Sequence, residues 1–504
     1  MPEWESRKEN CMKASANVFL LLLAALPLAA REYDVRQFGA KGDFQTNDRA
    51  AIQAAIDACN HDGGGTVNVP AGRYFSGGLL LRSHVILHLD AGATIFASRK
   101  KEDYPPQRGF SDRYATLVTA NGAEDIGITG TGVLDGQSPE DLRSVVGGPP
   151  TDASFFRTGI ILFIDCRRVT LRDFNIHLSD MWTITLNQCD TVVIDGISIV
   201  NNPRRINSDG IDPVSCHNVH ISNVHVVAGD DAIDIKTQGG HDLENVVVTN
   251  CTLETTTTGL KVGTSTDGDM RDVHFSNITV KAPTGIGFYM KDGGTIERVT
   301  FSNITLEIPP FTYRGVQPIF MDIERRNPNS RLSHIRDISM RDIFVTAGSG
   351  ILIQGMPESH IQNLSLSNIS FRVPLADAYD KRSKAIGGSR TTSDERDTKY
   401  ARMPSYMTLA YVDGLVLDEI RIEQSEEAAA KYERSSVWVE EATDVMMRGI
   451  RCTPPRGETG LPVIMLHDVD RVRVTGSMAL PGTKKFLQTT GNASHVSVED
   501  MDNR

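Results

Sequence analysis

Two short segments of the chain place carboxylates at matching positions, NSDGID at 207–212 and GDDAIDIK at 229–236. Aligning their Asp-x-x-Asp patterns brings Asp209 beside Asp231, at an offset of 22 residues, with Asp230 adjacent. Carboxylates held this close raise the proton affinity of at least one member, so one stays protonated near neutral pH while a neighbour is ionised. The cluster therefore has the division of protons that general acid–base catalysis requires.

Hydrolysis of a glycosidic bond with inversion of configuration is the reaction that suits such a cluster. One carboxylic acid protonates the leaving oxygen, and a carboxylate about 6.5–9.5 Å away activates a water on the opposite face of the sugar. Asp230 lies one residue out of register with the other two acids, which supplies a separation. Lys261 and Lys291 follow on later repeats, with Tyr289 expected above Lys261, and the two ammonium groups are expected to hold an anionic sugar.

Two simpler explanations apply to these acids. Single Asp residues cap turns at the corners of repeating folds, and clusters of acids bind calcium. Two Asp-rich turns in register, followed by two lysines, favour a catalytic site over either explanation.

Neighbouring coils of a repeating fold would bring these acids together, and the sequence contains such a repeat. A six-residue pattern has apolar residues at its first, third and usually sixth places. Its copies begin at residues 169, 192, 219, 246, 273 and 299, and weaker copies begin at 338, 364, 415, 445 and 472. Short alternating segments at this period predict stacked β-strands about 4.8 Å apart rather than leucine-rich repeats or propeller blades. The predicted fold is all-β, a single-stranded right-handed parallel β-helix.

Other segments fit the same fold. Residues 47–60 have apolar residues at helical spacing and predict a short helix that caps the N-terminal end of the solenoid. The fifth place of five copies is Asn, which predicts a ladder of amides between coils: Asn223, Asn250, Asn277, Asn303 and Asn368. Longer polar insertions are expected at about 137–158, 308–334 and 374–406.

The N-terminus indicates export. Residues 18–30 read VFLLLLAALPLAA, too short for a membrane-spanning helix but typical of a signal peptide, and Met12 provides the better start. We therefore expect residues 1–30 to be a signal peptide, residues 31–504 to be one β-helix domain, and the protein to be secreted or periplasmic. No association with a membrane is expected after the signal is removed.

Composition narrows the function further. The chain has 504 residues, 40% of them apolar, which is ample for a large core. A net charge of −12 argues against a general binder of nucleic acids or anionic membranes. Six cysteines remain outside the signal, and the four in the repeats are expected to be buried apolar groups rather than disulfides: Cys166, Cys189, Cys216 and Cys251. We expect a monomer that uses no cofactor and no metal.

The chain also resembles a known family. NSDGID is similar to the Asn-Thr-Asp-Gly motif, and GDDAI to the Asp-Asp motif, of glycoside hydrolase family 28, the polygalacturonase and rhamnogalacturonase group. The resemblance runs from residues 32–59 through GTGVLDG (130–136) to residues 287–304. It implies the same parallel β-helix and a pectic polysaccharide or oligosaccharide as substrate.

The resemblance also implies roles for individual residues. By position, Asp230 corresponds to the general acid, and Asp209 and Asp231 to the pair that holds the attacking water. Asn207 and Asp212 are implied to support the site or bind in a subsite.

Two departures from the family pattern concern substrate choice. Thr258 stands where the family's Gly-His-Gly motif has His, and Tyr289 stands where its Arg-Ile-Lys motif has Arg, while Lys291 keeps the Lys. We expect Lys261 to replace the lost Arg as a point charge, and Tyr289 to stack on a neutral sugar such as rhamnose. Substrates of galacturonan and rhamnogalacturonan type both remain open.

Two alternatives to a hydrolase remain. A calcium-dependent pectate lyase of the same shape would need a basic residue, for which Arg204 and Arg205 are available. A non-catalytic polysaccharide-binding β-helix would bind without turnover. Trp182 is equally suited to be a sugar platform or a buried aromatic.

Overall fold

A computed structural model describes residues 32–107, 114–139, 156–309, 317–374, 399–400 and 403–500. The expected signal peptide and most of the insertions expected at about 137–158 and 374–406 lie outside these residues. Of the insertion expected at about 308–334, residues 310–316 lie outside them, whereas Gln317–Ile323 form a mostly buried strand of the solenoid, so this expectation is wrong there. None of the helices in the described part of the chain combines the length and hydrophobicity that a membrane crossing needs.

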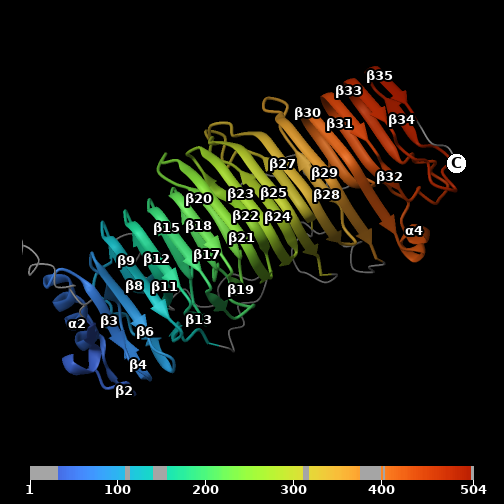
Figure 1. The fold of residues 1–504 in the computed structure, drawn as a ribbon. Helices are drawn as coiled ribbons and strands as arrows, with labels where there is room; N and C mark the ends of the chain where they lie inside the picture. Colours follow the sequence, from blue (N-terminus) through green and yellow to red (C-terminus); the bar gives the residue numbers. More distant parts are fainter. Residues whose placement is uncertain are drawn as a thin grey trace, which may run out of the picture.

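The described residues form an elongated solenoid of parallel strands, coloured in sequence order from one end to the other in Figure 1. Its strands pair with the equivalent strands of the preceding and following coils, in three stacks. The predicted right-handed parallel β-helix is confirmed.

The first stack, called the site sheet below, carries the predicted acids. It contains β5 (Leu79–Leu80), β8 (Tyr114–Asn121), β11 (Arg157–Ile164), β14 (Ile184–Asn187), β17 (Ile211–Val214), β20 (Ile233–Thr237), β22 (Thr258–Thr266), β24 (Thr284–Met290), β26 (Gln317–Ile323), β28 (Ile351–Gln354), β34 (Leu487–Thr490) and the first parts of β30 (Ser405–Gln424), β31 (Ser435–Arg448) and β33 (Ile464–Thr475).

The second stack carries the six-residue repeats. It contains β1 (Glu32–Asp34), β3 (Gly65–Val69), β6 (Val85–Leu89), β9 (Glu124–Gly130), β12 (Arg167–Arg172), β15 (Asp190–Asp195), β18 (His217–Ser222), β21 (Leu243–Thr255), β23 (Met270–Lys281), β25 (Thr295–Glu307), β27 (His334–Thr346), β29 (Ile361–Val373), β35 (Ser494–Glu499) and the later parts of β30, β31 and β33. The predicted repeat starts pair with one another in order, from Val169 with Val192 to Val445 with Val472.

The third stack closes the coil. It contains β2 (Asp43–Asn47), β4 (Gly72–Ser76), β7 (Ala93–Ala97), β10 (Val133–Asp135), β13 (Asn175–His177), β16 (Ser198–Val200), β19 (His225–Ala228), β32 (Arg451–Cys452) and the ends of the long strands β21, β23, β25, β27, β29 and β30. Inward-facing side chains of all three stacks form one continuous apolar core.

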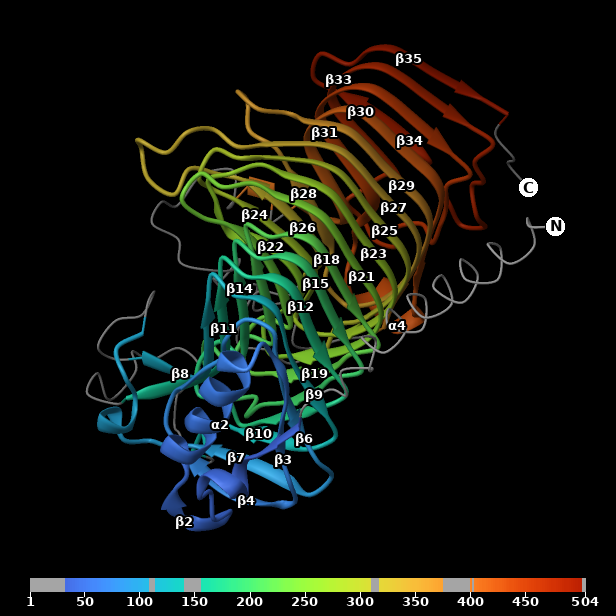
Figure 2. The ribbon, with the colours of Figure 1, turned by 60° about the vertical axis from the view of Figure 1, so that its left-hand side comes forward.

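The described helices are short and lie outside the coils. They are the 3-10 helices η1 (Val35–Phe38) and η2 (Lys101–Asp103) and the α-helices α2 (Arg49–His61) and α4 (Glu426–Lys431). The predicted cap is α2, which begins within two residues of its expected start and buries Ile52, Ala55, Ile56 and Cys59. It lies across the N-terminal end of the solenoid (Figures 1 and 2), where it covers strand edges that would otherwise be exposed.

The predicted amide ladder forms for four of its five asparagines, and the predicted burial of the repeat cysteines is confirmed. The amide of Asn303 donates to Asn277 at 2.8 Å, Asn277 to Asn250 at 3.2 Å, and Asn250 to Asn223 at 3.4 Å, which forms the ladder. Asn368 donates to Asp342 instead. The six cysteines among the described residues are unpaired and buried.

Candidate active site

The register of the site sheet aligns the predicted acids. Strand β17 pairs with β20 through Ile211 and Ile233, an offset of 22, and β20 pairs with β22 through Asp234 and Lys261. Because side chains alternate along a strand, the Ile residues enter the core and the polar residues beside them face outward. The predicted alignment of NSDGID with GDDAID is therefore correct.

The three predicted catalytic acids come together on two neighbouring turns and are between 4% and 8% exposed. Thr257, one coil later, donates from one hydroxyl to Asp230 Oδ1 (3.1 Å) and Asp231 Oδ1 (2.8 Å). Asp230 Oδ2 accepts from the backbone N–H of Asn207 at 2.8 Å. Burial, then repulsion from Asp212, Asp230 and Asp231, raise the pKa of Asp209 against the opposing charge of Lys236.

Two lysines lie among the acids. Lys261 forms ion pairs with Asp231 and with Asp234, the latter at 2.9 Å. Lys236, which was not among the predicted site residues, contacts Asp212, Asp234 at 2.8 Å and Asp209 at 3.6 Å. The alternation in AIDIK already places Lys236 on the same strand face as Asp234, so a signal for it was present in the sequence.

The environments of the acids push their pKa values apart. Burial first, and then repulsion from Asp212 and Asp230, raise the pKa of Asp209 well above its ordinary value. Burial raises the pKa of Asp212 to about 7, against the opposing charge of Lys236. Burial also favours a raised pKa for Asp231, but the ammonium of Lys261 outweighs burial, and the pKa of Asp231 is lowered. Within the cluster a proton is therefore held more readily by Asp209, and a negative charge more readily by Asp231.

The residues beyond Lys261 lie differently from the prediction. Tyr289 pairs with Gly263, and Lys261 pairs with Gly287, so the expected alignment of Tyr289 with Lys261 is wrong by two residues. An even shift keeps Tyr289 on the same face, and its ring reaches back over Gly287, where an added Cβ would lie 2.7 Å from the ring. Lys261 Nζ consequently still lies 5.8 Å from the ring centroid.

The remaining predicted binding residues separate into two groups. Thr258 lies in the site, where its backbone N–H donates to Asp231 Oδ1 at 3.2 Å and its hydroxyl lies 3.5 Å from the Tyr289 hydroxyl. Lys291 is 1% exposed and forms an ion pair with Glu324 rather than with any acid of the cluster.

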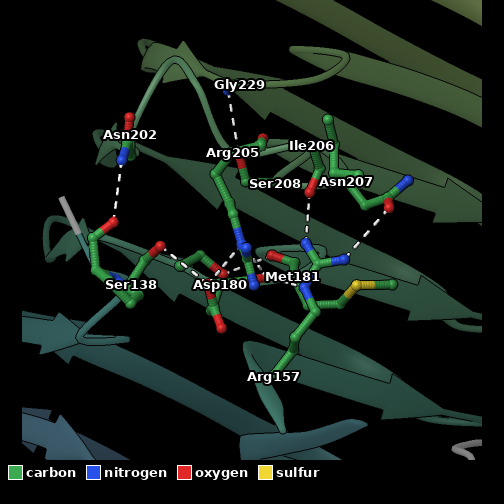
Figure 3. A network of polar contacts seen from close by, with 12 residues as sticks. Ser138, Arg157, Asp180, Met181, Asn202, Arg205, Ile206, Asn207, Ser208 and Gly229 are labelled. Carbon is green, nitrogen blue, oxygen red and sulfur yellow. Dashed lines mark hydrogen bonds and ion pairs between the residues drawn. The ribbon is translucent and has the colours of Figure 1, made fainter. Parts of the chain in front are cut away.

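A polar network lies on the N-terminal side of the acids (Figure 3). Asp180 binds Arg205 through Oδ1 at 2.6 Å, and its carbonyl accepts from Arg157 Nε at 2.7 Å. Arg157 also donates to the carbonyl of Ile206 and to Asn207 Oδ1 at 3.3 Å. These contacts hold the turn that ends at the acids, where the backbone of Asn207 is left-handed (φ 54°). Their partners are 23 to 50 residues apart, which is why the sequence offered no signal for them.

Trp182 is half-buried and lies beside Lys236, the lysine that contacts Asp209, Asp212 and Asp234. Its ring centroid lies 5.2 Å from Lys236 Nζ, a cation–π distance, so the indole supports the lysine that bridges the acids.

Comparisons with known proteins identify the family of the chain. The family model for glycosyl hydrolases family 28 matches residues 59–382. A probable polygalacturonase of Vitis vinifera is 23% identical over 399 residues, which cover 73% of this chain and 79% of that protein.

Solved structures share the fold. An exopolygalacturonase from Thermotoga maritima has a TM-score of 0.59 and 23% identity, covering 68% of this chain and 87% of that one. A family 28 exopolygalacturonase from Yersinia enterocolitica has a TM-score of 0.60 and 18% identity, covering 88% and 78%. With the family model matching more than half of its length, the chain belongs to glycosyl hydrolase family 28 and is a glycoside hydrolase.

Proposed function

We propose that the protein hydrolyses glycosidic bonds in a pectic polysaccharide or its oligomers, of galacturonan or rhamnogalacturonan type, with inversion at the anomeric carbon. Membership of family 28 and the similarity to polygalacturonases support the substrate class. The observation that carries the mechanism is the paired Asp turns, in which three buried carboxylates have different partners.

In this mechanism Asp230 is the general acid. It transfers its proton to the glycosidic oxygen as the bond from that oxygen to the anomeric carbon breaks. A water held by Asp209 and Asp231 attacks the same carbon from the opposite face, and its proton passes to the ionised carboxylate. Burial raises the pKa of Asp231, but the ammonium of Lys261 outweighs burial and lowers it, so we assign Asp231 as the ionised carboxylate that accepts the proton of the water. Burial and the neighbouring acids raise the pKa of Asp209, so we assign Asp209 as the protonated partner that orients the water.

The neighbouring residues are assigned to binding and positioning. Asn207 holds Asp230 through its backbone, Asp212 anchors Lys236, and Thr258 holds Asp231. Lys261 and Tyr289 line the C-terminal side of the cluster. Lys291, the other lysine expected to hold an anionic sugar, forms an ion pair with Glu324, to which we assign the positioning of its ammonium group.

The wider setting follows the sequence expectations. We propose that residues 1–30 direct export, that residues 31–504 act as one domain, and that the enzyme works outside the cytoplasm or in the periplasm as a monomer.

A calcium-dependent lyase is the second candidate, because one observation favours a cation. Carboxylate oxygens of Asp209, Asp212 and Asp234 lie within 4.8 Å of one another, a spacing that suits calcium. The Lys236 ammonium contacts all three acids, however, and already supplies the positive charge that a cation would bring.

Product analysis tests the proposal. Polygalacturonate, rhamnogalacturonan and their oligomers are incubated with the protein, with and without a chelator, and products are followed by NMR. We expect hydrolysis that survives chelation, with inverted anomeric configuration and no unsaturated ends. Unsaturated products that vanish with chelator would establish the lyase, retained configuration would exclude inversion, and binding without turnover would leave a polysaccharide-binding protein.

A further inference from the structure

One hydroxyl group lies between two of the catalytic acids. Thr257 Oγ1 is 3.1 Å from Asp230 Oδ1 and 2.8 Å from Asp231 Oδ1, and Thr257 is 3% exposed. The two carboxyl groups are those assigned above as the general acid and as the acceptor of the water's proton. Thr257 Oγ1 therefore connects the group that gives a proton during cleavage to the group that takes one.

The turn between β21 and β22 fixes the position of this hydroxyl. The backbone N–H of Thr257 donates to Thr255 Oγ1 at 3.3 Å, and its carbonyl accepts from the N–H of Thr284 on the next coil at 3.0 Å. The Thr255 hydroxyl in turn donates to the backbone carbonyl of Asp230. Because the side chain of Thr is short and restricted at χ1, these backbone contacts hold Oγ1 between the two acids.

The number of protons on this hydroxyl limits the charges of its two partners. A hydroxyl has one proton to donate and two lone pairs that accept, so it cannot make ordinary hydrogen bonds to two ionised carboxylates at once. If it donates to Asp231, at the shorter distance, it can accept from a protonated Asp230. Asp231 also has the ammonium of Lys261 as a partner, which favours its negative charge. The contacts thus favour a proton on Asp230 and a charge on Asp231 before cleavage.

Cleavage leaves the protons in the opposite arrangement. Asp230 has given its proton to the leaving oxygen, and Asp231 has taken one from the attacking water, so the acid is ionised and the base is protonated. A second cleavage requires the proton to return. Asp230 is 8% and Asp231 5% exposed, so bulk water has little access to either carboxyl group.

We propose that Thr257 is a positioning residue that returns this proton and restores the starting state after each cleavage. The O–H bond on Asp231 Oδ1 breaks as its proton passes to Thr257 Oγ1, while the original hydroxyl proton of Thr257 passes to Asp230 Oδ1 and forms the new O–H bond there. Thr257 gains one proton and loses one, so it stays neutral and no other reactant is consumed. The inference rests on the proposed hydrolase function and adds a step to it.

Transient kinetics of Thr257→Val test the relay, because Val keeps the shape of Thr and lacks the hydroxyl. The first cleavage needs only the starting protonation, whereas each later one needs the returned proton. On a pectic oligomer that the wild type cleaves, we expect a burst of about one product per enzyme molecule, and then a kcat about 10- to 100-fold below that of the wild type. Formate or acetate buffer, which can carry the proton instead, should raise the slow rate.

Two control variants separate the hydroxyl from the fold. Thr257→Ser keeps a hydroxyl at this position and should retain the wild-type kcat within about threefold, without a burst. Thr443→Val removes another threonine hydroxyl that donates to a carboxylate, that of Asp413 at 2.7 Å, on the second stack. This change should leave the first and later turnovers within about twofold of the wild type.

The two rates decide the proposal. If Thr257→Val slows the first turnover as much as the later ones, the hydroxyl only holds the acids in place and the proposal is wrong; an unchanged kcat would overturn it equally. Should Thr257→Val fail to fold, Thr257→Ala is measured in the same way and decides by the same two rates. Absence of hydrolysis by the wild type on every pectic oligomer would instead reject the hydrolase function itself.

Discussion

Residues of the same type stack on successive coils in two regions of the solenoid, where they attract one another in the first and repel one another in the second. On its outer corner, Asn223, Asn250, Asn277 and Asn303 form a ladder in which each amide donates to the one before it. On the site sheet, the same stacking places Asp212 beside Asp234 on successive coils. A side-chain amide both donates and accepts hydrogen bonds, so it can bond to the equivalent amide on the next coil. An ionised carboxylate only accepts hydrogen bonds, and it repels the equivalent carboxylate on the next coil. Stacking thus stabilises the corner through hydrogen bonds, whereas at the site it raises the proton affinity of the carboxylates.

The lysines resolve the repulsion at the site. Lys236 and Lys261 insert ammonium groups between the acids, and all of these charges are largely buried. A neutral ladder needs no such partner. The contrast between the two regions can be tested by substitutions in each.

The largest effect is expected from Asp230→Asn. Asn keeps the shape of the side chain but cannot give a proton to the leaving oxygen, so kcat should fall by about 10²–10⁴-fold. Steady-state kinetics on the best pectic oligomer measure the loss. Because Asn matches the protonated acid in size and charge, the melting temperature should change little, and a variant that cleaves normally would show that Asp230 is not the acid.

The next effect concerns the ammonium that bridges the acids. Lys236→Met fills similar space but leaves Asp209, Asp212 and Asp234 without their shared cation, so we expect a loss of about 3–5 kcal/mol of unfolding free energy. The pKa values of these acids should rise further, which moves the acidic limb of the kcat/KM–pH profile to higher pH. A variant with unchanged stability and an unchanged profile would contradict the bridging role.

A smaller effect is expected from Asp212→Asn, which should change how the free energy of unfolding depends on pH. The folded pKa of Asp212 is about 7, above the unfolded value of about 3.9, so the folded state binds this proton more tightly. This contribution to stability is fully present below about pH 4 and is lost as pH rises towards 7. Denaturation at pH 4, 5.5 and 7 should therefore show the variant gaining on the wild type as pH rises, and the opposite slope would disprove the raised pKa.

The smallest effect is expected on the corner. Asn277→Ala removes two exposed amide hydrogen bonds and the residue type that suits a left-handed backbone (φ 55°), for about 1 kcal/mol of stability. Asn277→Gly keeps the backbone conformation accessible and isolates the amide contribution. Neither change should alter kcat, and a change in rate would mean that corner and site are coupled.

The sequence predicted the parts of the site that follow from period and alternation. The repeat starts at residues 169 to 472 all pair as predicted, even where two neighbouring starts are 39 or 51 residues apart, because the six-residue pattern itself marks the register. The error at Tyr289 arose on the site sheet, outside that pattern, where the strands pair at an offset of 26 rather than the expected 28. A recurring pattern therefore predicts register through insertions, and register is less certain where no pattern recurs.

The sequence by itself determined the β-helix, its capping helix and the juxtaposition of Asp209 with Asp231, because stacked coils convert sequence period into distance. Only the tertiary structure decided which cation meets which acid. It engages Lys236 with Asp209, Asp212 and Asp234, turns Lys291 to Glu324, and joins Arg157 to Asn207 across 50 residues. Long flexible side chains reach across several coils, and burial and charge choose their partners, which no spacing in the sequence records.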